Sequence, residues 1–398
     1  MTTSTPKRPP SRSLRLSLDD PRVAGLFWQI LVVGIAIAIV AWLWSNAVHN
    51  LSVRRISTGF AFLGREAGMP ISDSWIDYTP KNTYLRAFIV GLVNTLRVAV
   101  IGIVLATVIG TLVGIARLST NWLLSRLAAV YVEVLRDLPL LLQLLFWYVL
   151  MQGLPAARQA WKPVEGVFLS NRGLILPSVP LHEANLWTIL ALIVGVIVFV
   201  IVRRRLIAQQ MLDGKARPAW PYALALIVAL PVLVSFLAGA SWSITLPELR
   251  GFNFVGGLTL APEYFALLIA LVTYTSAFIA EIVRSGIQAV PRGQWDAAKA
   301  LGLKPSFSLQ HIVLPQALRV VVPSLVGQIL DIFNGATLVF IIGLTDFLRA
   351  GQMILADPQN SSRTYEIYVF LFAVYLAIGG AITYASRRLE AHLARGSR

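Results

Sequence analysis

Eight long apolar runs constrain this chain more than any other feature of its sequence. They cover roughly residues 23–44, 87–116, 127–152, 186–202, 220–240, 263–284, 320–344 and 366–386. Each run approaches the ~20 residues that an α-helix needs to cross the hydrocarbon core of a bilayer. Inside lipid a helix satisfies its own backbone hydrogen bonds, whereas a membrane-spanning barrel would need alternating segments of about ten residues. We therefore expect an all-α polytopic membrane protein with about eight transmembrane helices.

The composition agrees with a membrane protein and argues against other classes. Of 398 residues, 57% are hydrophobic and 13% are charged, whereas soluble domains carry about 25% charged residues. The net charge of +15 would suggest nucleic-acid binding in a soluble protein, but basic residues at the cytoplasmic ends of spans give the same total. We expect the lipid bilayer, and no nucleic acid, as a partner. The chain has no cysteine, which excludes disulfides and zinc–thiolate sites.

The distribution of Lys and Arg predicts the orientation in the membrane. If the N-terminus is cytoplasmic, the inner segments carry 21 Lys and Arg residues and the outer segments carry 11. Positively charged loops prefer the cytoplasmic side. The triplet Arg203–Arg205 is the strongest single indication, while Arg54 and Arg55 oppose it from a long outer loop. We expect both termini in the cytoplasm.

The stretch GQWDAAKALGLKPSFSLQHIVLP, residues 293–315, predicts a short helical hairpin on the cytoplasmic side. Asp296 lies near the positive end of the first helix, and Ala297, Ala298 and Ala300 give it a surface for close approach. Gly302 is placed to end this helix in a left-handed cap, and Pro305 suits the first turn of the second. We expect Pro315 to end the second helix. An amphipathic loop on lipid headgroups is the alternative, but rigid caps and alanines suit a protein partner better.

Two motifs resemble a known family. The pattern D-A-A-x3-G, followed nine residues after its Gly by I-x-L-P (Ile312, Leu314 and Pro315), is similar to the cytoplasmic EAA loop of ABC importer permeases. The upstream segment YVEVLRDLPLLLQLLFWYVL resembles the E-x2-R-x2-P-L-L segment of the polar amino-acid subfamily. The segments RRISTGFAFLGREAG and GLVNTLRVAV resemble the general L-amino-acid permeases in particular. The resemblance covers nearly the whole chain.

The resemblance implies a type I ABC importer permease fold and a division of labour. This chain would be a permease subunit in the bacterial inner membrane. It would work with a cytosolic ABC ATPase dimer, a second permease subunit and a periplasmic amino-acid-binding protein. ATP would be bound by the ATPase, so no cofactor is expected here. The loop would dock on the ATPase through a set of coupling residues. These are Asp296, Ala297, Ala298, Gly302, Leu314 and Pro315.

The same resemblance implies a domain organisation around a five-helix permease core. An N-terminal helix and an inserted helix pair would be additions to this core. The expected organisation comprises a disordered cytoplasmic tail (1–22), an N-terminal helix with an external loop (23–86), a first core segment (87–152), an inserted external loop and helix pair (153–262), a second core segment (263–386) with the coupling loop 285–318, and a cytoplasmic tail (387–398).

The chain departs from the family pattern at three places. Asp296 replaces the usual Glu, which keeps the charge but shortens the reach. Lys304 stands where relatives often have Ser or Thr, and it cannot accept an N-capping bond, which costs about 1 kcal/mol of helix stability. Asn334 and Gly335 stand where relatives usually have Lys and Asp or Asn. The substrate range is therefore open.

Charged and polar residues within the spans are candidates for the substrate path. They are Glu133, Arg136, Glu281, Asp331, Asn334 and Thr337. Intramembrane charges face a bundle interior or a path, and they also serve as internal ion pairs, so both interpretations stay open. The stripe Asp331, Asn334 and Thr337 is expected to face the bundle interior, and Arg97 to extend toward the outer interface. Pro139 is expected to kink the third span.

Other chemistries find little support in the sequence. Gly214-Lys215 lacks the rest of a nucleotide-binding loop, the four histidines show no metal-ligand spacing, and no G-x-S-x-G motif occurs. A secondary transporter or channel driven by an ion gradient would explain Asp331 and Glu281, but it leaves residues 293–315 unexplained, and inverted repeats are not evident. The exact amino acid, the identity of the second permease and the role of the inserted pair are not determined by the sequence.

Overall fold

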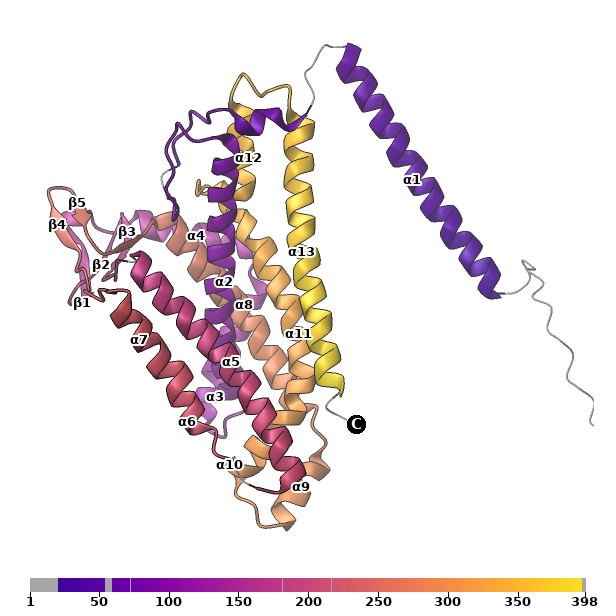
Figure 1. The fold of residues 1–398 in the computed structure, drawn as a ribbon, viewed down its shortest axis with the longest axis vertical. Helices are drawn as coiled ribbons and strands as arrows, with labels where there is room; N and C mark the ends of the chain where they lie inside the picture. The colour runs from indigo at the N-terminus through magenta and orange to yellow at the C-terminus, as the bar shows by residue number, and fades with distance from the viewer. Residues whose placement is uncertain (1–20, 54–58, 72, 181, 216, 396–398) are drawn as a thin grey trace, which may run out of the picture.

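The computed structural model describes residues 21–53, 59–71, 73–180, 182–215 and 217–395, and it shows a helical bundle with a small β-region at one end (Figure 1). The main helices are α1 (Pro21–Val53), α2 (Tyr84–Arg117), α3 (Trp122–Asp137), α4 (Leu140–Gln152), α5 (Glu183–Asp213), α7 (Leu230–Leu237), α8 (Pro262–Gln288), α11 (Leu314–Gly335) and α13 (Thr364–Arg395). The shorter helices are η1 (Phe60–Gly64), η2 (Ala157–Gln159), α6 (Trp220–Ala223), η3 (Leu224–Ala229), α9 (Arg292–Ala300), α10 (Pro305–Ser308), η4 (Leu309–Val313), η5 (Ala336–Ile341) and α12 (Phe347–Ala356). Of the expected tail 1–22, residues 1–20 lie outside the described residues.

The number of candidate spans confirms the expected polytopic fold. Among the described residues, seven helices are long and apolar enough to cross a membrane, and the bent pair α3–α4 gives up to eight. Most helices extend beyond the apolar runs. For example, α5 continues to Asp213, well past the predicted end of its span at residue 202. Hydrophobicity marks the part of a helix that lies in lipid, whereas the helix itself continues into the polar layers.

The expected span over 127–152 consists of two helices bent by 103°, which is a sharper break than the kink expected at Pro139. Helix α3 ends at Asp137 and α4 begins at Leu140, so the break falls at the predicted position of Pro139. Proline lacks an N–H and forces the preceding residue into an extended conformation. The buried side chain of Gln143 then fills the gap: its Nε2 donates to the carbonyl oxygens of Leu135 and Leu138 at 2.9 and 3.1 Å.

The expectation that Pro315 ends the second short helix is also wrong. Helix α10, the π-helical segment η4 and helix α11 follow without interruption, and Ser306–Ile341 forms one long apolar helix. Pro315 lies in the first turn of α11, directly after the π-turn Leu309–Val313. A π-turn shifts the hydrogen-bond pattern by one residue, so the missing N–H of proline breaks no α-helical bond there. Pro231 follows the π-turn η3 in the same way.

The core of the bundle is the crossing of α2 and α8. A stripe of small residues on α2, made of Ala106, Gly110 and Gly114, is buried and faces α8. A Cβ atom on Gly110 would lie 2.7 Å from the Cβ of Ile279, and one on Gly114 would lie 2.6 Å from the carbonyl oxygen of Ala280. The two backbones therefore approach as closely as glycine permits. Helices α3, α4 and α11 pack around α8.

The inserted pair α5–α7 packs mainly on itself. Gly195 of α5 lies against the backbone of Leu226, where an added Cβ would lie 2.0 Å from the carbonyl oxygen. Figure 1 shows this pair along one side of the bundle and α1 apart on the other. The apolar window of α1 has no buried residue. Both elements therefore present apolar side chains to their surroundings.

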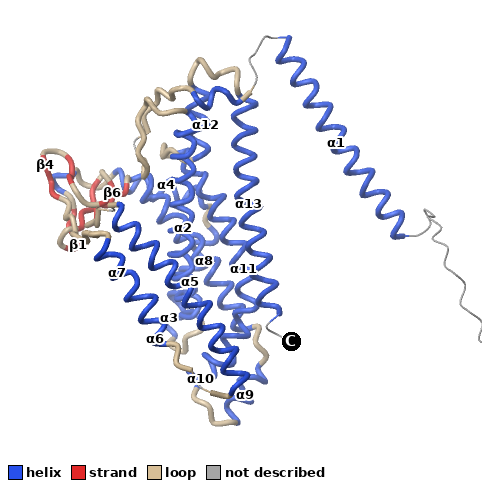
Figure 2. The backbone as a smooth tube through the Cα atoms, viewed as in Figure 1, coloured by secondary structure: helices blue, strands red, loops and turns tan. Residues whose placement is uncertain are grey.

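The segments before and after the inserted pair form small sheets that the sequence analysis did not predict (Figure 2). The strands are β1 (Trp161–Val164), β2 (Val167–Ser170), β3 (Gly173–Leu176), β4 (Glu248–Arg250), β5 (Asn253–Val255) and β6 (Leu258–Leu260). One antiparallel sheet has the order β1-β2-β3-β6, with Leu174 opposite Leu260, and β4 pairs with β5. Strand β6 leads directly into α8 and fixes its N-terminal end.

We predict that Gly110→Ala destabilises the protein, whereas Gly102→Ala in the same helix does not. The new methyl group at 110 has no room against Ile279, and overpacking of this kind costs about 1–3 kcal/mol. At 102 the nearest atom to an added Cβ is 3.6 Å away, an ordinary contact. Thermal unfolding of both variants in the same detergent measures the difference. Equal melting temperatures would show that the α2–α8 crossing is looser than described.

Candidate functional site

The hairpin that precedes α11 is a rigid unit. Helix α9 begins after Pro291 and ends in a left-handed cap, as predicted, with Gly302 at φ 68°. The N–H of Gly302 donates to the Lys299 carbonyl at 2.9 Å, and the N–H of Leu303 donates to the Ala298 carbonyl at 3.1 Å. This pair of bonds is the Schellman motif, which closes a helix end and reverses the chain. As predicted, the second helix begins at Pro305.

One face of the hairpin is fixed to the bundle. Val290, Val313 and Ala317 form a small buried cluster, against which Ile287 and Trp295 pack. Ala298 is also buried, so this alanine faces the hairpin's own interior rather than a partner. The hairpin therefore moves together with the end of α8 and the start of α11.

The opposite face of the hairpin is exposed. Asp296, Ala297 and Gly302 are exposed, and nothing lies within 4 Å of a Cβ placed on Gly302. Two apolar side chains that the sequence analysis did not single out accompany them: Leu301 is 77% exposed and Phe307 is 48% exposed. The ring of Phe307 stacks on His311 at 4.1 Å. Exposed apolar side chains around a rigid turn are typical of a protein-docking surface.

Leu314 and Pro315 lie at the root of the hairpin rather than at its tip. Both are exposed at the start of α11. Leu314 lines a groove of about 960 Å³ between the α2–α3 corner and the hairpin, together with Leu124, Trp295 and Leu309. The structure therefore brings four of the predicted coupling residues together on α9 and its cap, and places Leu314 and Pro315 beside them.

The predicted polar stripe of α11 does not face the bundle interior. Asp331 and Asn334 are exposed, and Thr337 is half-buried. Gln328 extends the stripe, with its Nε2 donating to Asp331 Oδ2 at 3.4 Å. The interior-facing side of α11 is taken by apolar residues such as Ile332 and Phe333, which are buried. Within a membrane helix, an exposed carboxylate is costly next to lipid, so the stripe indicates a protein partner or an aqueous path.

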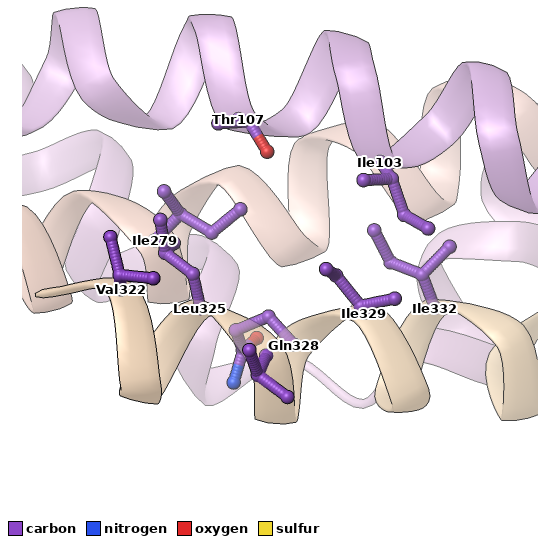
Figure 3. A pocket seen from close by; sticks show the side chains of 9 residues that line it. Ile103, Thr107, Ile279, Val322, Leu325, Gln328, Ile329 and Ile332 are labelled. Carbon is purple, nitrogen blue, oxygen red and sulfur yellow. The ribbon is translucent and has the colours of Figure 1, made fainter. Parts of the chain in front are cut away.

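A cavity of about 210 Å³ lies beside this stripe, between α2, α8 and α11. Figure 3 shows Gln328 and Thr107 among apolar side chains such as Ile103, Ile279 and Leu325. Its lining is mostly apolar, so it offers few polar groups to a zwitterion. The cavity therefore does not replace the stripe as the candidate path.

The predicted charges near the inner ends of the spans behave differently from one another. Glu281 pairs with Arg284 of the same helix at 2.5 Å and also with Arg117 from the last turn of α2 at 2.5 Å. Glu133 and Arg136 are exposed, and among the described residues no ion pair joins them. The guanidinium of Arg136 instead lies 5.1 Å from the ring centroid of Phe278. Glu281 thus joins two helices, whereas Glu133 and Arg136 remain available on the surface of α3.

Arg97 extends toward the first turn of α8, at the end of the bundle where the chain enters that helix, but it is buried there rather than exposed at an interface. The residue is only 7% exposed, and its guanidinium contacts the ring of Tyr264. The signal in the sequence was the pair Trp75 and Asp73, which lie near α2 in the chain and contact Arg97 in space. Only the fold shows that they meet. The described residues hold no group of three or more potential metal ligands.

Comparison with known proteins gives the family. The family described as "Binding-protein-dependent transport system inner membrane component" matches residues 221–395. The chain is 44% identical to the putative amino-acid ABC transporter permease protein YhdX of Escherichia coli, over 92% of this chain and 93% of that protein. The chain belongs to the ABC transporter permease family. It is therefore a multi-pass inner-membrane protein and a transmembrane subunit of an ABC transporter.

Further relatives share nearly the full length. The general L-amino acid transport system permease protein AapQ of Rhizobium johnstonii is 39% identical, over 94% of this chain and 93% of that protein. The permease BztB of a glutamate/glutamine/aspartate/asparagine transport system in Rhodobacter capsulatus is 34% identical, over 94% of this chain and 95% of that protein. The added helix α1 and the inserted pair α5–α7 fall within these matched lengths.

We predict that Gly302→Val impairs ATP-driven transport while Gly293→Val is tolerated. Valine at φ 68° is strained by more than about 1 kcal/mol, which opens the cap and reorients the two short helices. Gly293 is also exposed, but it has ordinary helical geometry, and nothing lies within 4 Å of a Cβ placed there. Uptake and the amount of assembled complex are measured together. Normal uptake by an assembled Gly302→Val complex would contradict the role of the hairpin.

Proposed function

We propose that this chain is the transmembrane permease subunit of an ATP-driven amino-acid importer. The observation that carries the proposal is the full-length similarity to three permeases, each of which is named for amino-acid transport. A rigid hairpin with an open face at one end of the bundle supports it. The chain supplies the path and the coupling element, while a separate ATPase binds and hydrolyses ATP.

The open face of the hairpin is the proposed contact with the ATPase dimer. Asp296 and Ala297 lie on the exposed side of α9, and Gly302 turns the chain so that Leu301 and Phe307 flank them. Two apolar anchors around a small charged surface match a groove on a partner. Because Val313 and Ala317 fix the hairpin to the start of α11, a displacement of the hairpin moves that helix.

The polar stripe of α11 is the proposed wall of the translocation path. Asp331 and Asn334 are exposed on the side of α11 away from buried Ile332 and Phe333, and half-buried Gln328 donates to Asp331. A second permease opposite this face would close a polar path between the two subunits, to which an external binding protein delivers the substrate. Glu133 and Arg136 on α3 are further exposed polar groups for this path. Glu281 is assigned to the structural ion pairs instead.

The rival mechanism is a secondary transporter or channel driven by an ion gradient. It would use Asp331 and Glu281 as ion or proton sites. In the structure Glu281 is engaged by two arginines, and Asp331 is exposed on a different helix, so the two carboxylates do not form one site. The rival mechanism also gives the hairpin no role.

The test of the function uses the chain with its partners. The permease is expressed with a cognate ATPase, second permease and binding protein and is reconstituted in vesicles. Uptake of labelled L-amino acids should require ATP and the binding protein, and ionophores that collapse ion gradients should leave it unchanged. Uptake that follows an ion gradient without ATP would overturn the proposal.

We predict that both termini and the hairpin lie in the cytoplasm. The inner ends of α5 and α13 lie at the same end of the bundle as α9 and α10 (Figure 1). Reporter fusions after Arg204 and after Arg388 should give cytoplasmic signals, and a fusion after Asn171 should give an external one. An external signal at Arg204 would contradict the placement of α5 as a span.

We predict that Asp331→Ala abolishes or strongly reduces uptake of all substrates while ATPase association is unchanged. The reason is that a carboxylate within an apolar helix costs about 2.5–3.5 kcal/mol at mid-membrane, and an α-amino group of the substrate is a partner for it. Asp213→Ala is the matched control, because this carboxylate is also exposed but pairs with Arg217 at 2.8 Å at the end of α5. Normal uptake by Asp331→Ala would refute the path.

A further inference from the structure

Arg97 is held in an unusual environment near the outer end of α8. Its guanidinium contacts two aromatic rings, with Cζ 3.9 Å from the ring centroid of Trp75 and 3.8 Å from that of Tyr264. These two cation–π contacts limit the directions from which a hydrogen-bonding partner can approach the N–H groups of the guanidinium. Residue Arg97 is 7% exposed, and Tyr264 is 1% exposed.

The edge of this guanidinium lacks hydrogen-bond acceptors. Among the described residues, the buried Nε, Nη1 and Nη2 atoms of Arg97 find no acceptor with hydrogen-bond geometry, although the Tyr264 hydroxyl lies close enough to interact with the guanidinium. The nearest acid is Asp73, whose Oδ1 lies 3.7 Å from Nη1, an ion-pair distance that is too long for a hydrogen bond. A buried hydrogen-bond donor without an acceptor lowers the stability of the folded protein. The planar fork of arginine matches a carboxylate that approaches its edge.

Asp73 belongs to a short flap, defined as residues 73–76, that covers Arg97. Trp75 of the flap is 52% exposed, so its ring separates the guanidinium from the outside. Asn94 holds the flap, with its Nδ2 donating to the Asp73 carbonyl at 2.7 Å. Within the described residues, no backbone–backbone hydrogen bond reaches residues 73–76.

The segment that follows the flap is firmly attached. Arg86 donates to the Asp77 carbonyl at 3.0 and 3.2 Å, and Gly68 donates to the Pro80 carbonyl at 2.8 Å. An isolated bridge pairs Glu66 with Thr83. The flap can therefore lift from Arg97 while the chain on its C-terminal side stays in place.

We propose that Arg97 is a carboxylate-binding site for the transported amino acid, and that Asp73 occupies the carboxylate position when the flap is closed. The proposal rests on the proposed function, because amino acids carry the α-carboxylate that the site would take. Burial raises the pKa of the Asp73 carboxyl although Arg97 opposes this, so Asp73 is a poorly satisfied partner that a ligand can replace. Glu263, next to Tyr264, lies close enough to act on Asp73 electrostatically and offers a partner to the substrate ammonium.

The first test fixes the flap to α2 with an engineered disulfide. The chain has no cysteine of its own, so no native thiol competes with the introduced pair. The double variant Asp73→Cys/Asn94→Cys joins the flap to α2 when oxidised. The control Glu66→Cys/Thr83→Cys joins the two neighbouring segments to each other and leaves the flap free. Thiol titration verifies each disulfide in the reconstituted complex.

The oxidised flap variant should lose at least about tenfold in uptake relative to its own reduced form, and reductant should restore it. The control should transport equally in both states. Equal uptake by the oxidised and reduced flap variant would overturn the proposal. Because each variant is compared with itself, this result is independent of any loss from the substitutions. Failure of the wild-type complex to import amino acids with ATP would instead count against the proposed function.

The second test asks whether Arg97 recognises a carboxylate. Phenylglyoxal modifies accessible arginines, and mass spectrometry of the peptide that contains Arg97 measures the modification in the intact chain. Asp73→Ala/Trp75→Ala should raise the labelling of Arg97 severalfold over wild type. L-Leucine should protect Arg97 in this variant, and L-leucinamide, which has the ammonium but no carboxylate, should not. No increase in labelling, or equal protection by both compounds, would overturn the proposal.

Discussion

The crossing of α2 and α8 is the interaction on which the rest of the structure depends. Ala106, Gly110 and Gly114 let the two backbones approach until an added Cβ would overlap Ile279 or Ala280. In lipid the hydrophobic effect gives helices little reason to associate, so close packing and polar contacts must hold them together. Both are present here: Arg117 and Glu281 pair near the C-terminal ends of the two helices, and Arg97 makes a cation–π contact with Tyr264 at the N-terminal end of α8.

This crossing makes α8 a connector between the two ends of the molecule. At its N-terminal end α8 follows strand β6 and carries Tyr264 under the flap, and at its C-terminal end it leads through Val290 into α9. Helix α11 also packs closely against α8 at Gly286, where an added Cβ would lie 2.2 Å from a methyl group of Val321. The proposed coupling hairpin, path helix and outer carboxylate site are therefore attached to one rigid pair of helices. A displacement of any one of these three elements is therefore transmitted to the other two through α2 and α8.

The sequence was informative wherever a property is local. Apolar runs predicted the spans, Pro139 predicted the break in the third span, and Gly302 and Pro305 predicted the cap and the start of the two short helices. It was not informative where a residue depends on a distant partner. Pro315 is compatible with a continuous helix because a π-turn precedes it, and Arg97 is buried because Trp75 and Tyr264, which lie far apart in the sequence, both contact it. The direction of the Asp331 stripe likewise follows from which face of α11 packs on the bundle.

The continuity of α11 with the hairpin changes how motion can reach the path. If Pro315 ended a separate helix, the hairpin and the span would be joined by a flexible break. Instead Val313 to Asp331 is one helical segment, which at about 1.5 Å per residue is about 27 Å long. The π-turn before Pro315 keeps the backbone continuous but gives it a locally wider and more easily adjusted turn. Val313 and Ala317, on either side of Pro315, pack in the same small cluster with Val290. A displacement of the hairpin therefore reaches the polar stripe through a continuous helix rather than through a loop, and Pro323 inside α11 marks the position at which this helix can bend.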